Sequence, residues 1–424
     1  MFLRKLLITA GLVLLWVFIV AAVIGADVFY FSAPAVVRGD RASIEKHLVD
    51  RINTAIEDRQ AGAVGLVLID RGKIASVHTF GTSDAAGQRP VDPEKTLFRV
   101  ASVSKAVTAW GVMKLVEEGK IGLDEPILPY LKRWRFPGSE TYRDKVTVRQ
   151  LLSHTAGLDD DLGYVGFPPG EPMQSVEESL TLTKDTPDGK PRPVRVAWEP
   201  GTAMAYESGG YTILQLLVEE MTEKPFCEFM KHSVLKPMDM EHSTFDFDEL
   251  EAEGHLKDIA PDFDNGLQQQ PHRRHVSQAG EGFYATPLEL ARFATAYVGD
   301  NPVLRPETVN QMISPQSATG GSGGLGQTLF VENSSGGQIV GHDGVSPPAW
   351  GAWFRVDPAT GNGMVMTVSG GTTVLNHLAD DWVYWETGKV TPEARMQTVR
   401  DRTIPAAIAI IIGALVIALW RILR

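Results

Sequence analysis

The sequence predicts an α/β fold in which both ends of a globular domain contribute strands to one sheet. Strand patterns occupy residues 63–80 and return over 328–369, whereas the chain between them is rich in helical periodicity. Sheet elements at both ends favour a single sheet, with the mostly helical middle, roughly residues 124–262, inserted beside it. The 424 residues are enough for two or three average domains, or for one catalytic unit with such an insertion.

The first elements of the domain are predicted to be a helix followed by a hairpin. Residues 43–58 carry an apolar residue at every fourth position: Ile44, Leu48, Ile52 and Ile56. Residues 63–73 are typical of a strand that ends in a turn, and residues 74–80 of its antiparallel partner. The hairpin therefore predicts the first part of the sheet.

The remaining elements follow the same rules of periodicity. Helices are predicted after Ser102 up to a C-cap at Gly119, and over 146–152, 212–221, 288–297 and, closing the domain, 374–385. Further strands are predicted over 328–331, 338–341, 349–356 and 363–369. The long polar stretch 159–193 has the length of a lid or binding loop, and the glycine-rich stretch 319–326 is predicted to border the same cleft.

Both ends of the chain carry long apolar runs. Arg4 and Lys5 precede a run over 6–26, and a second run over 404–420 is followed by Arg421 and Arg424. Each run is near the length of a membrane-spanning helix, and the flanking positive charges place both termini in the cytoplasm. A cleaved signal peptide is the alternative for the first run.

These runs set the predicted organisation of the chain. It comprises a membrane anchor or signal peptide over 1–26, a connector over 27–42, the globular domain over 43–388, a linker over 389–402 and a transmembrane helix over 403–424. The globular domain is accordingly predicted to lie outside the cell membrane, in the periplasm or at the cell surface. A protein partner within the bilayer is a further possibility that the second helix raises.

Composition excludes several classes of function. A net charge of −12 and a pI near 5.4 argue against a nucleic-acid partner, which requires basic patches. The single cysteine, Cys227, lies in an amphipathic helix and reads as a small buried hydrophobe. The histidines show no metal-binding spacing, so we expect neither a metal nor another cofactor.

The pair Ser102 and Lys105 is the first indication of chemistry. Three residues apart at the start of a helix, the two side chains share one face, so the lysine amine can reach the serine hydroxyl. A serine becomes a nucleophile when a neighbouring base takes its proton. The alternative is a helix N-cap followed by a solvated lysine. The dense apolar run behind the pair favours covalent hydrolase chemistry.

Two further segments bear on this site. Tyr206 stands before Ser208 and two glycines, on a tight turn from which its hydroxyl is able to enter a cleft. In the second segment, His342 and Gly344 follow a predicted strand, where a backbone N–H of the strand edge is able to polarise a carbonyl. Taken alone, each segment favours a structural role: a surface or core tyrosine in the first, and a surface or capping histidine in the second.

Taken in order, these motifs resemble the serine β-lactamase and penicillin-binding-protein superfamily, and specifically its class C-like branch of esterases, D-aminopeptidases and carboxypeptidases. Ser102 to Lys105 resembles the family's S-x-x-K motif, residues 206–208 its Y-x-N or Y-x-S motif, and residues 342–344 its K-T-G or H-x-G motif. The resemblance covers about residues 45–385. Supporting blocks also look similar: residues 151–158, 235–240 and 279–286. The resemblance implies an antiparallel sheet flanked by helices.

The resemblance also implies a role for each motif residue. Ser102 would be acylated, and Lys105 and Tyr206 would share the general base and acid work, with the actual base left open. The other motif residues would bind the substrate. Ser208 would hydrogen-bond it, and His342 and Gly344 would line the site. The backbone N–H groups of Ser102 and Val345 would form the oxyanion hole.

Departures from the family pattern narrow the predicted substrate. His342 replaces a lysine that attracts a substrate carboxylate, and Ser208 replaces an asparagine amide. Both changes favour an ester, amide or peptide substrate over a β-lactam. The alternatives are a weak β-lactamase, or a penicillin-binding or sensor domain that is acylated without efficient turnover. An α/β-hydrolase is excluded because the G-x-S-x-G at residues 320–324 lacks a preceding strand and a following helix.

Overall fold

A computed structural model covers the whole chain. It describes residues 39–391 except 138–140, 160–163, 265, 319–323, 326–329, 333–338 and 347–348. Of the terminal segments it describes residues 15–20, 22, 394, 404–405, 407–408, 411–413 and 415–416. In these described stretches, no helix has the length and apolar content required to traverse a bilayer. The predicted terminal spans lie largely outside the described residues, and the predicted domain boundaries stay predictions.

The sheet combines strands from both ends of the domain, as predicted, and every described pairing in it is antiparallel. Its described strands run in the order β2-β1-β12-β11-β10-β9-β8-β7. Their bounds are β1 Ala63–Asp70, β2 Lys73–Gly81, β7 Ser317–Ala318, β8 Gly324–Leu325, β9 Phe330–Glu332, β10 Ile339–Ser346, β11 Trp350–Val356 and β12 Gly363–Ser369. The hairpin of β1 and β2 thus joins the C-terminal strands through β12.

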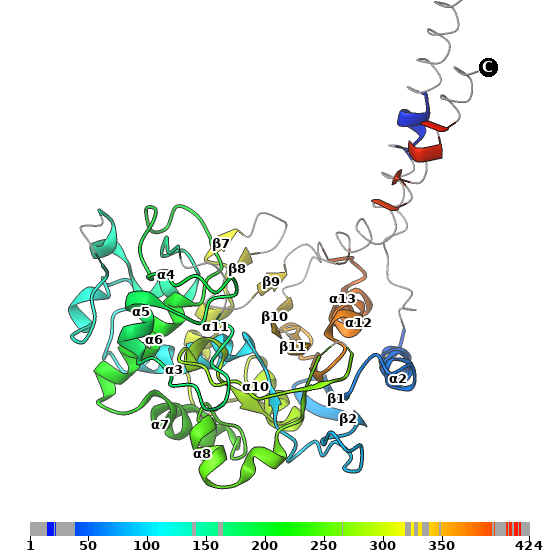
Figure 1. Cartoon of the computed structure of the whole chain (residues 1–424), viewed down its shortest axis with the longest axis horizontal. Coiled ribbons are helices and arrows are strands. Elements are labelled where there is room, and N and C mark those ends of the chain that lie inside the picture. The colour runs from blue at the N-terminus through cyan, green and yellow to red at the C-terminus, as the bar shows by residue number, and fades with distance from the viewer. Residues whose placement is uncertain are drawn as a thin grey trace, which may run out of the picture. The chain divides into compact units, whose positions relative to one another are not determined.

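Twelve α-helices and four short strands with described bounds are separate from this sheet (Figure 1). The larger helices are α2 Arg41–Glu57, α3 Val103–Glu117, α6 Gly209–Thr222, α10 Pro287–Thr295, α11 Pro306–Ile313 and α13 Leu378–Thr387. The shorter helices are α4 Val148–Leu152, α5 Val176–Leu182, α7 Phe226–Met230, α8 Phe247–Ala252, α9 Gln278–Glu281 and α12 Thr372–Leu375. Short strand pairs are β3 Phe98–Arg99 with β6 Tyr284–Ala285, and β4 Asp262–Phe263 with β5 Gln269–Gln270.

Helices cover both faces of the sheet near β1. A Cβ at Gly65 would lie 2.3 Å from Pro287, the first residue of α10, so this position faces α10. The neighbouring position on the strand, Leu66, is paired with His78, whose Nε2 lies 2.8 Å from Glu45 of α2. Because successive residues of a strand point to opposite faces, α10 and α2 lie on opposite sides. The sheet is therefore the middle of three layers.

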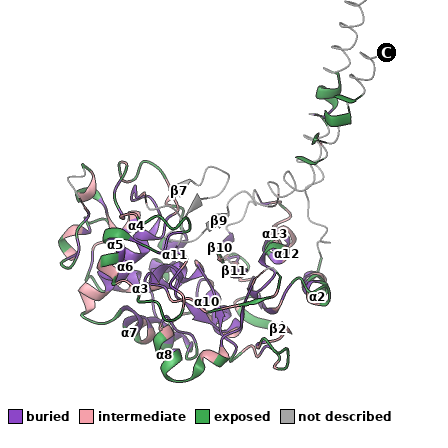
Figure 2. Cartoon of the chain, in the orientation of Figure 1, coloured by how far each residue is buried: buried purple, intermediate pink, exposed green. Residues whose placement is uncertain are grey.

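The main hydrophobic core lies between the sheet and the helices of the insertion. It is built around α3, of which twelve residues are buried, together with α6 and α10 (Figure 2). Trp110 of α3 makes edge-on contacts with Phe293 and Tyr297. A helix buried on nearly all sides is typical of a domain centre. The predicted nucleophile Ser102 is the N-cap of this helix and therefore adjoins a rigidly held element.

The structure corrects three predictions of local structure. Residues 342–344 do not follow a strand but lie within β10, because this strand continues its pairing with β11 to Ser346. The single helix predicted over 374–385 is two helices, α12 and α13. The polar stretch 159–193 contains α5, whose N-cap Ser175 accepts from the backbone of Glu178 in a capping box.

Candidate active site

Ser102 lies on a strained turn between β3 and α3. The preceding residue, Ala101, has a φ of 47°, in the left-handed region that side chains disfavour. Ser104 holds this turn: its Oγ donates to the carbonyl of Ala101 at 2.6 Å and accepts from the backbone N–H of Phe283 at 3.0 Å. Strained backbone maintained by its surroundings is common at functional sites.

The Ser102 hydroxyl is at the centre of a small polar network. The Lys105 Nζ donates to Ser102 Oγ at 3.1 Å, so the predicted meeting of these side chains is present. A third group completes the network, because Ser102 Oγ donates to Glu281 Oε1 at 2.8 Å and Lys105 Nζ donates to the same oxygen at 3.0 Å. Lys105 also donates to the carbonyl of Gly280 at 3.2 Å.

Lys105 carries a positive charge in this arrangement. Its side chain is fully buried, and burial alone acts to lower the pKa of an ammonium group. The negative charge and hydrogen bond of Glu281, together with Tyr206, outweigh that effect and raise the pKa of Lys105 well above its ordinary value. In the resting site the amine is thus protonated and is not available to accept a proton.

Tyr206 completes the group around Ser102. Its ring centroid lies 5.1 Å from Lys105 Nζ, and its hydroxyl hydrogen-bonds with both Ser102 and Lys105. Burial raises the pKa of Tyr206, and the positive charge of Lys105 offsets this only in part. The phenol is therefore neutral at pH 7, with its hydroxyl directed at the nucleophile.

The buried pair of His154 and Glu207 lies next to Tyr206. The ring of His154 lies 4.4 Å from the Tyr206 ring, and its Nδ1 is 3.4 Å from Glu207 Oε1. Burial, followed by the charge of Lys105, lowers the pKa of His154 well below its ordinary value. Burial raises the pKa of Glu207 to about 7. Residues 151–158, which the sequence marked only as a supporting block, thus contribute a ring that packs against Tyr206.

Strand β10 closes the other side of the site. His342 and Gly344, two residues apart, point to the same face of the strand. A Cβ at Gly344 would lie 2.0 Å from the carbonyl oxygen of Val100 and 3.1 Å from the backbone nitrogen of Ser102, so only glycine allows this approach. His342 is fully buried, and its ring centroid is 6.4 Å from that of Tyr206. The side chain of Val345 is exposed.

His342 lacks the charge that an exposed histidine partly carries at neutral pH. Burial, followed by the charge of Lys105, lowers the pKa of His342 well below its ordinary value. The neighbouring Asp343 pairs with Arg355 at 2.6 Å and lies on the opposite face of β10. The position that carries a lysine in related enzymes is therefore neutral here.

Ser208 is placed differently from the other predicted residues. It is the N-cap of α6 and is 1% exposed, and its Oγ has no hydrogen-bond partner among the residues described. The structure thus brings Ser102, Lys105, Tyr206, His342 and Gly344 together. A role of Ser208 in substrate binding stays a prediction.

Sequence reasoning missed Glu281. The residue stands in the block 279–286, which the sequence marked only as supporting. A charged residue between two glycines in an otherwise apolar segment was the one available signal. Cys227, by contrast, is buried, as predicted, and burial raises the pKa of its thiol well above the ordinary range.

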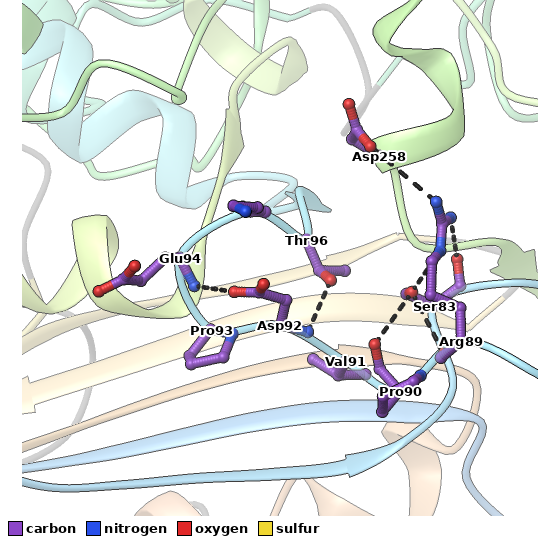
Figure 3. A pocket seen from close by; sticks show the side chains of 10 residues that line it. Ser83, Arg89, Pro90, Val91, Asp92, Pro93, Glu94, Thr96 and Asp258 are labelled. Atoms are coloured by element: carbon purple, nitrogen blue, oxygen red, sulfur yellow. Dashed lines mark hydrogen bonds and ion pairs between the residues drawn. The ribbon is translucent and has the colours of Figure 1, made fainter.

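A separate cavity of about 550 Å³ opens at the loop between β2 and β3 (Figure 3). Some of its polar groups hydrogen-bond with one another: Arg89 Nε donates to Ser83 Oγ at 3.0 Å, and the backbone N–H of Asp92 donates to Thr96 Oγ1 at 2.9 Å. None of the residues around Ser102 lines it.

The fold and the serine-centred network define the class of protein as a serine hydrolase. A family model described as Beta-lactamase matches residues 43–389, and the chain therefore belongs to the beta-lactamase family. This membership confirms the resemblance found in the sequence.

Individual relatives are distant. Penicillin-binding protein 4* of Bacillus subtilis (strain 168) is 28% identical over 197 residues, which are 46% of this chain and 40% of that protein. The chain thus spans well under half the length of this curated relative. Protein Rv1367c of Mycobacterium tuberculosis (strain ATCC 25618 / H37Rv) is 25% identical over 342 residues, covering 70% of this chain and 83% of that protein.

Solved structures show the same fold. A penicillin-binding protein homologue from Pyrococcus abyssi, described as octameric, has a TM-score of 0.66 at 22% identity, covering 83% of this chain and 78% of that chain. EstCE1, described as a hydrolase with promiscuous acyltransferase activity, has a TM-score of 0.63 at 20% identity, covering 80% of this chain and 98% of that one. At these identities the likeness concerns the fold alone.

Proposed function

We propose that the protein hydrolyses an ester or a D-amino-acid amide or peptide through an acyl-enzyme on Ser102. The proposal rests on the Ser102 hydroxyl at the start of α3, which is hydrogen-bonded to the buried Lys105 and to Glu281 of α9. Attack by Ser102 Oγ on the substrate carbonyl forms the acyl-enzyme and expels an alcohol or amine, and water then releases the acid.

The neutral environment of His342 supports this substrate class. A β-lactam or a peptide with a free carboxylate is best bound where a permanent cation faces it. Here burial keeps His342 uncharged, and Lys105 is already paired with Glu281. The binding of an uncharged ester or amide does not depend on such a cation at this position. The backbone N–H groups of Ser102 and Val345 are the proposed donors to the oxyanion.

We further propose that the domain works outside the cell membrane, tethered by the apolar runs at residues 6–26 and 404–420. Their length and flanking positive charges support this location. Expression of the full chain followed by fractionation and protease treatment of intact cells tests it. Recovery of the intact chain in the soluble fraction rejects the tether, whereas protection of the domain from external protease rejects its outward orientation.

The activity is tested with purified full-length chain on p-nitrophenyl esters, D-amino-acid p-nitroanilides and nitrocefin. We expect turnover of an ester or of a D-amino-acid anilide that exceeds turnover of nitrocefin, and none of it in Ser102→Ala. Retained activity of Ser102→Ala rejects the nucleophile. Intact-mass labelling of Ser102 without turnover supports the alternative of a sensor, and nitrocefin as the best substrate rejects the proposed specificity.

A further inference from the structure

Glu281 occupies a position from which it acts directly on the nucleophile. Its Oε1 is 2.8 Å from Ser102 Oγ, and the hydroxyl is the donor in this hydrogen bond. The carboxylate is nearly buried, with an exposed fraction of 7%, and α9, which carries it, packs on α3 and α6. The serine proton therefore already points at a carboxylate oxygen before any substrate arrives.

The hydrogen bonds of Lys105 leave it no capacity to act as the base. An ammonium group has three N–H donors and no acceptor. Lys105 Nζ has acceptors on Ser102, Gly280 and Glu281, all within 3.2 Å, and the Tyr206 hydroxyl is a further hydrogen-bond partner. A neutral amine would leave one of these buried acceptors without a donor. The arrangement is thus that of a fixed cation between a carboxylate and the serine oxygen.

Tyr206 is a weaker candidate than Glu281 for the group that accepts the serine proton. A tyrosine accepts the serine proton only as phenolate, and burial raises the pKa of Tyr206. An ionised carboxylate beside a lysine ammonium requires no prior loss of a proton. In this site the phenol is therefore a hydrogen-bonding group and not a proton acceptor.

Resting on the proposed acyl-enzyme chemistry, we propose that Glu281 accepts the Ser102 proton during acylation, with Lys105 as its permanent counter-ion. As the Oγ–C bond forms, the O–H bond of Ser102 breaks and its proton passes to Glu281 Oε1, while the carbonyl π electrons move to the oxyanion. When the oxyanion collapses, the bond to the leaving group breaks and the proton on Glu281 is transferred to the leaving alkoxide or amine. In deacylation Glu281 takes a proton from water and returns it to Ser102 Oγ.

The decisive comparison is between Glu281→Gln and wild type in the full-length chain. The glutamine oxygen still accepts hydrogen bonds from Ser102 and Lys105 but is unable to take a proton. General base catalysis contributes about 10²- to 10⁴-fold, so we expect kcat/KM on a p-nitrophenyl ester to fall by at least ~10²-fold. Glu281→Asp keeps a carboxylate and is expected to retain more activity than Glu281→Gln.

Glu289→Gln is the matched control. It removes another nearly buried carboxylate, on α10, which accepts from the backbone N–H groups of His242 at 3.0 Å and Ser243 at 2.7 Å. We expect this variant to keep kcat/KM within about threefold of wild type, which separates the loss of the base from the general effect of removing a buried charge. Melting temperatures of all variants are measured in parallel.

Chemical rescue supplies a readout that a purely structural role does not give. In Glu281→Ala, added formate is expected to restore p-nitrophenyl ester hydrolysis in proportion to its concentration, whereas chloride at equal ionic strength is not. Glu281→Gln at the wild-type rate overturns the proposal. So does an inactive Glu281→Ala that formate does not rescue. If Ser102→Ala remains active instead, it is the proposed function that fails, whatever the glutamate variants show.

Discussion

Replacement of Gly344 by alanine tests the geometry of the site most directly. The new Cβ would lie 2.0 Å from the carbonyl oxygen of Val100, 3.0 Å from the nitrogen of Val103 and 3.1 Å from that of Ser102. All three are backbone atoms of the nucleophile turn, which is fixed by β3 and the buried α3, so no side chain is able to rotate away. Strand β10 must therefore retreat by about 1.4 Å, from 2.0 Å to the 3.4 Å at which ordinary contacts begin, a displacement large enough to misplace a catalytic group.

We expect this displacement to reduce activity more than stability. A misplacement of about 1 Å lowers catalysis by ~10²-fold, and overpacking costs roughly 1–3 kcal/mol of unfolding free energy. The assay is kcat/KM on a p-nitrophenyl ester together with urea denaturation. Gly299→Ala is the control, because its Cβ would meet only the carbonyl of Thr295 at 3.5 Å. If Gly344→Ala retains both wild-type kcat/KM and stability, the close approach of β10 to Ser102 is refuted.

Two further predictions concern buried charges. Burial raises the pKa of Glu207 from its ordinary 4.5 to about 7, so between these two pH values the folded state keeps a proton that the unfolded state releases. The stability that protonated Glu207 contributes is fully present below pH 4.5, its pKa in the unfolded state, and declines as the pH rises to about 7. In urea denaturation, the free energy of unfolding of Glu207→Gln, relative to that of wild type, should therefore be higher at pH 8 than at pH 5. The same difference between variant and wild type at both pH values contradicts this prediction. Arg99→Met should cost about 3–5 kcal/mol in the same measurement, because it removes the permanent cation 2.8 Å from the buried Asp262 carboxylate and leaves it facing His272, whose Nδ1 is 3.1 Å away. A cost below about 1 kcal/mol contradicts the importance of the Arg99 pairing.

Local periodicity predicted most of the fold because burial on one or two faces leaves a direct trace in sequence. The hairpin of β1 and β2, the buried α3 and the strands β11 and β12 all lie where apolar patterns placed them. What periodicity could not supply was the extent of β10 and the presence of α5. The glycines of residues 341–344 have no side chain to mark a strand, and α5 is a seven-residue helix defined by a capping box within a polar segment.

The candidate site was predictable only where the motif residues are close in sequence or known from a resemblance. Ser102 and Lys105 meet because three residues on a helix are close to one turn, which sequence spacing determines. Glu281 reaches the same hydroxyl from a residue separation of 179, through the packing of α9 on α3. No spacing rule predicts such a contact. Similarly, the neutral state of His342 follows from its complete burial, which only the three-dimensional structure shows.

The placement of charge around Ser102 links the fold to the chemistry. A fully buried ammonium is costly unless a carboxylate faces it, and the same carboxylate is costly without the ammonium. The fold therefore stabilises Lys105 and Glu281 only as a pair, and both point at one hydroxyl. Since burial keeps His154, His342 and Tyr206 neutral, the pair is the dominant charge in the site. While the proton moves from Ser102 to Glu281, the Lys105 ammonium stays hydrogen-bonded to Ser102 Oγ, so the pairing that stabilises the resting site also stabilises the negative charge that develops on this oxygen.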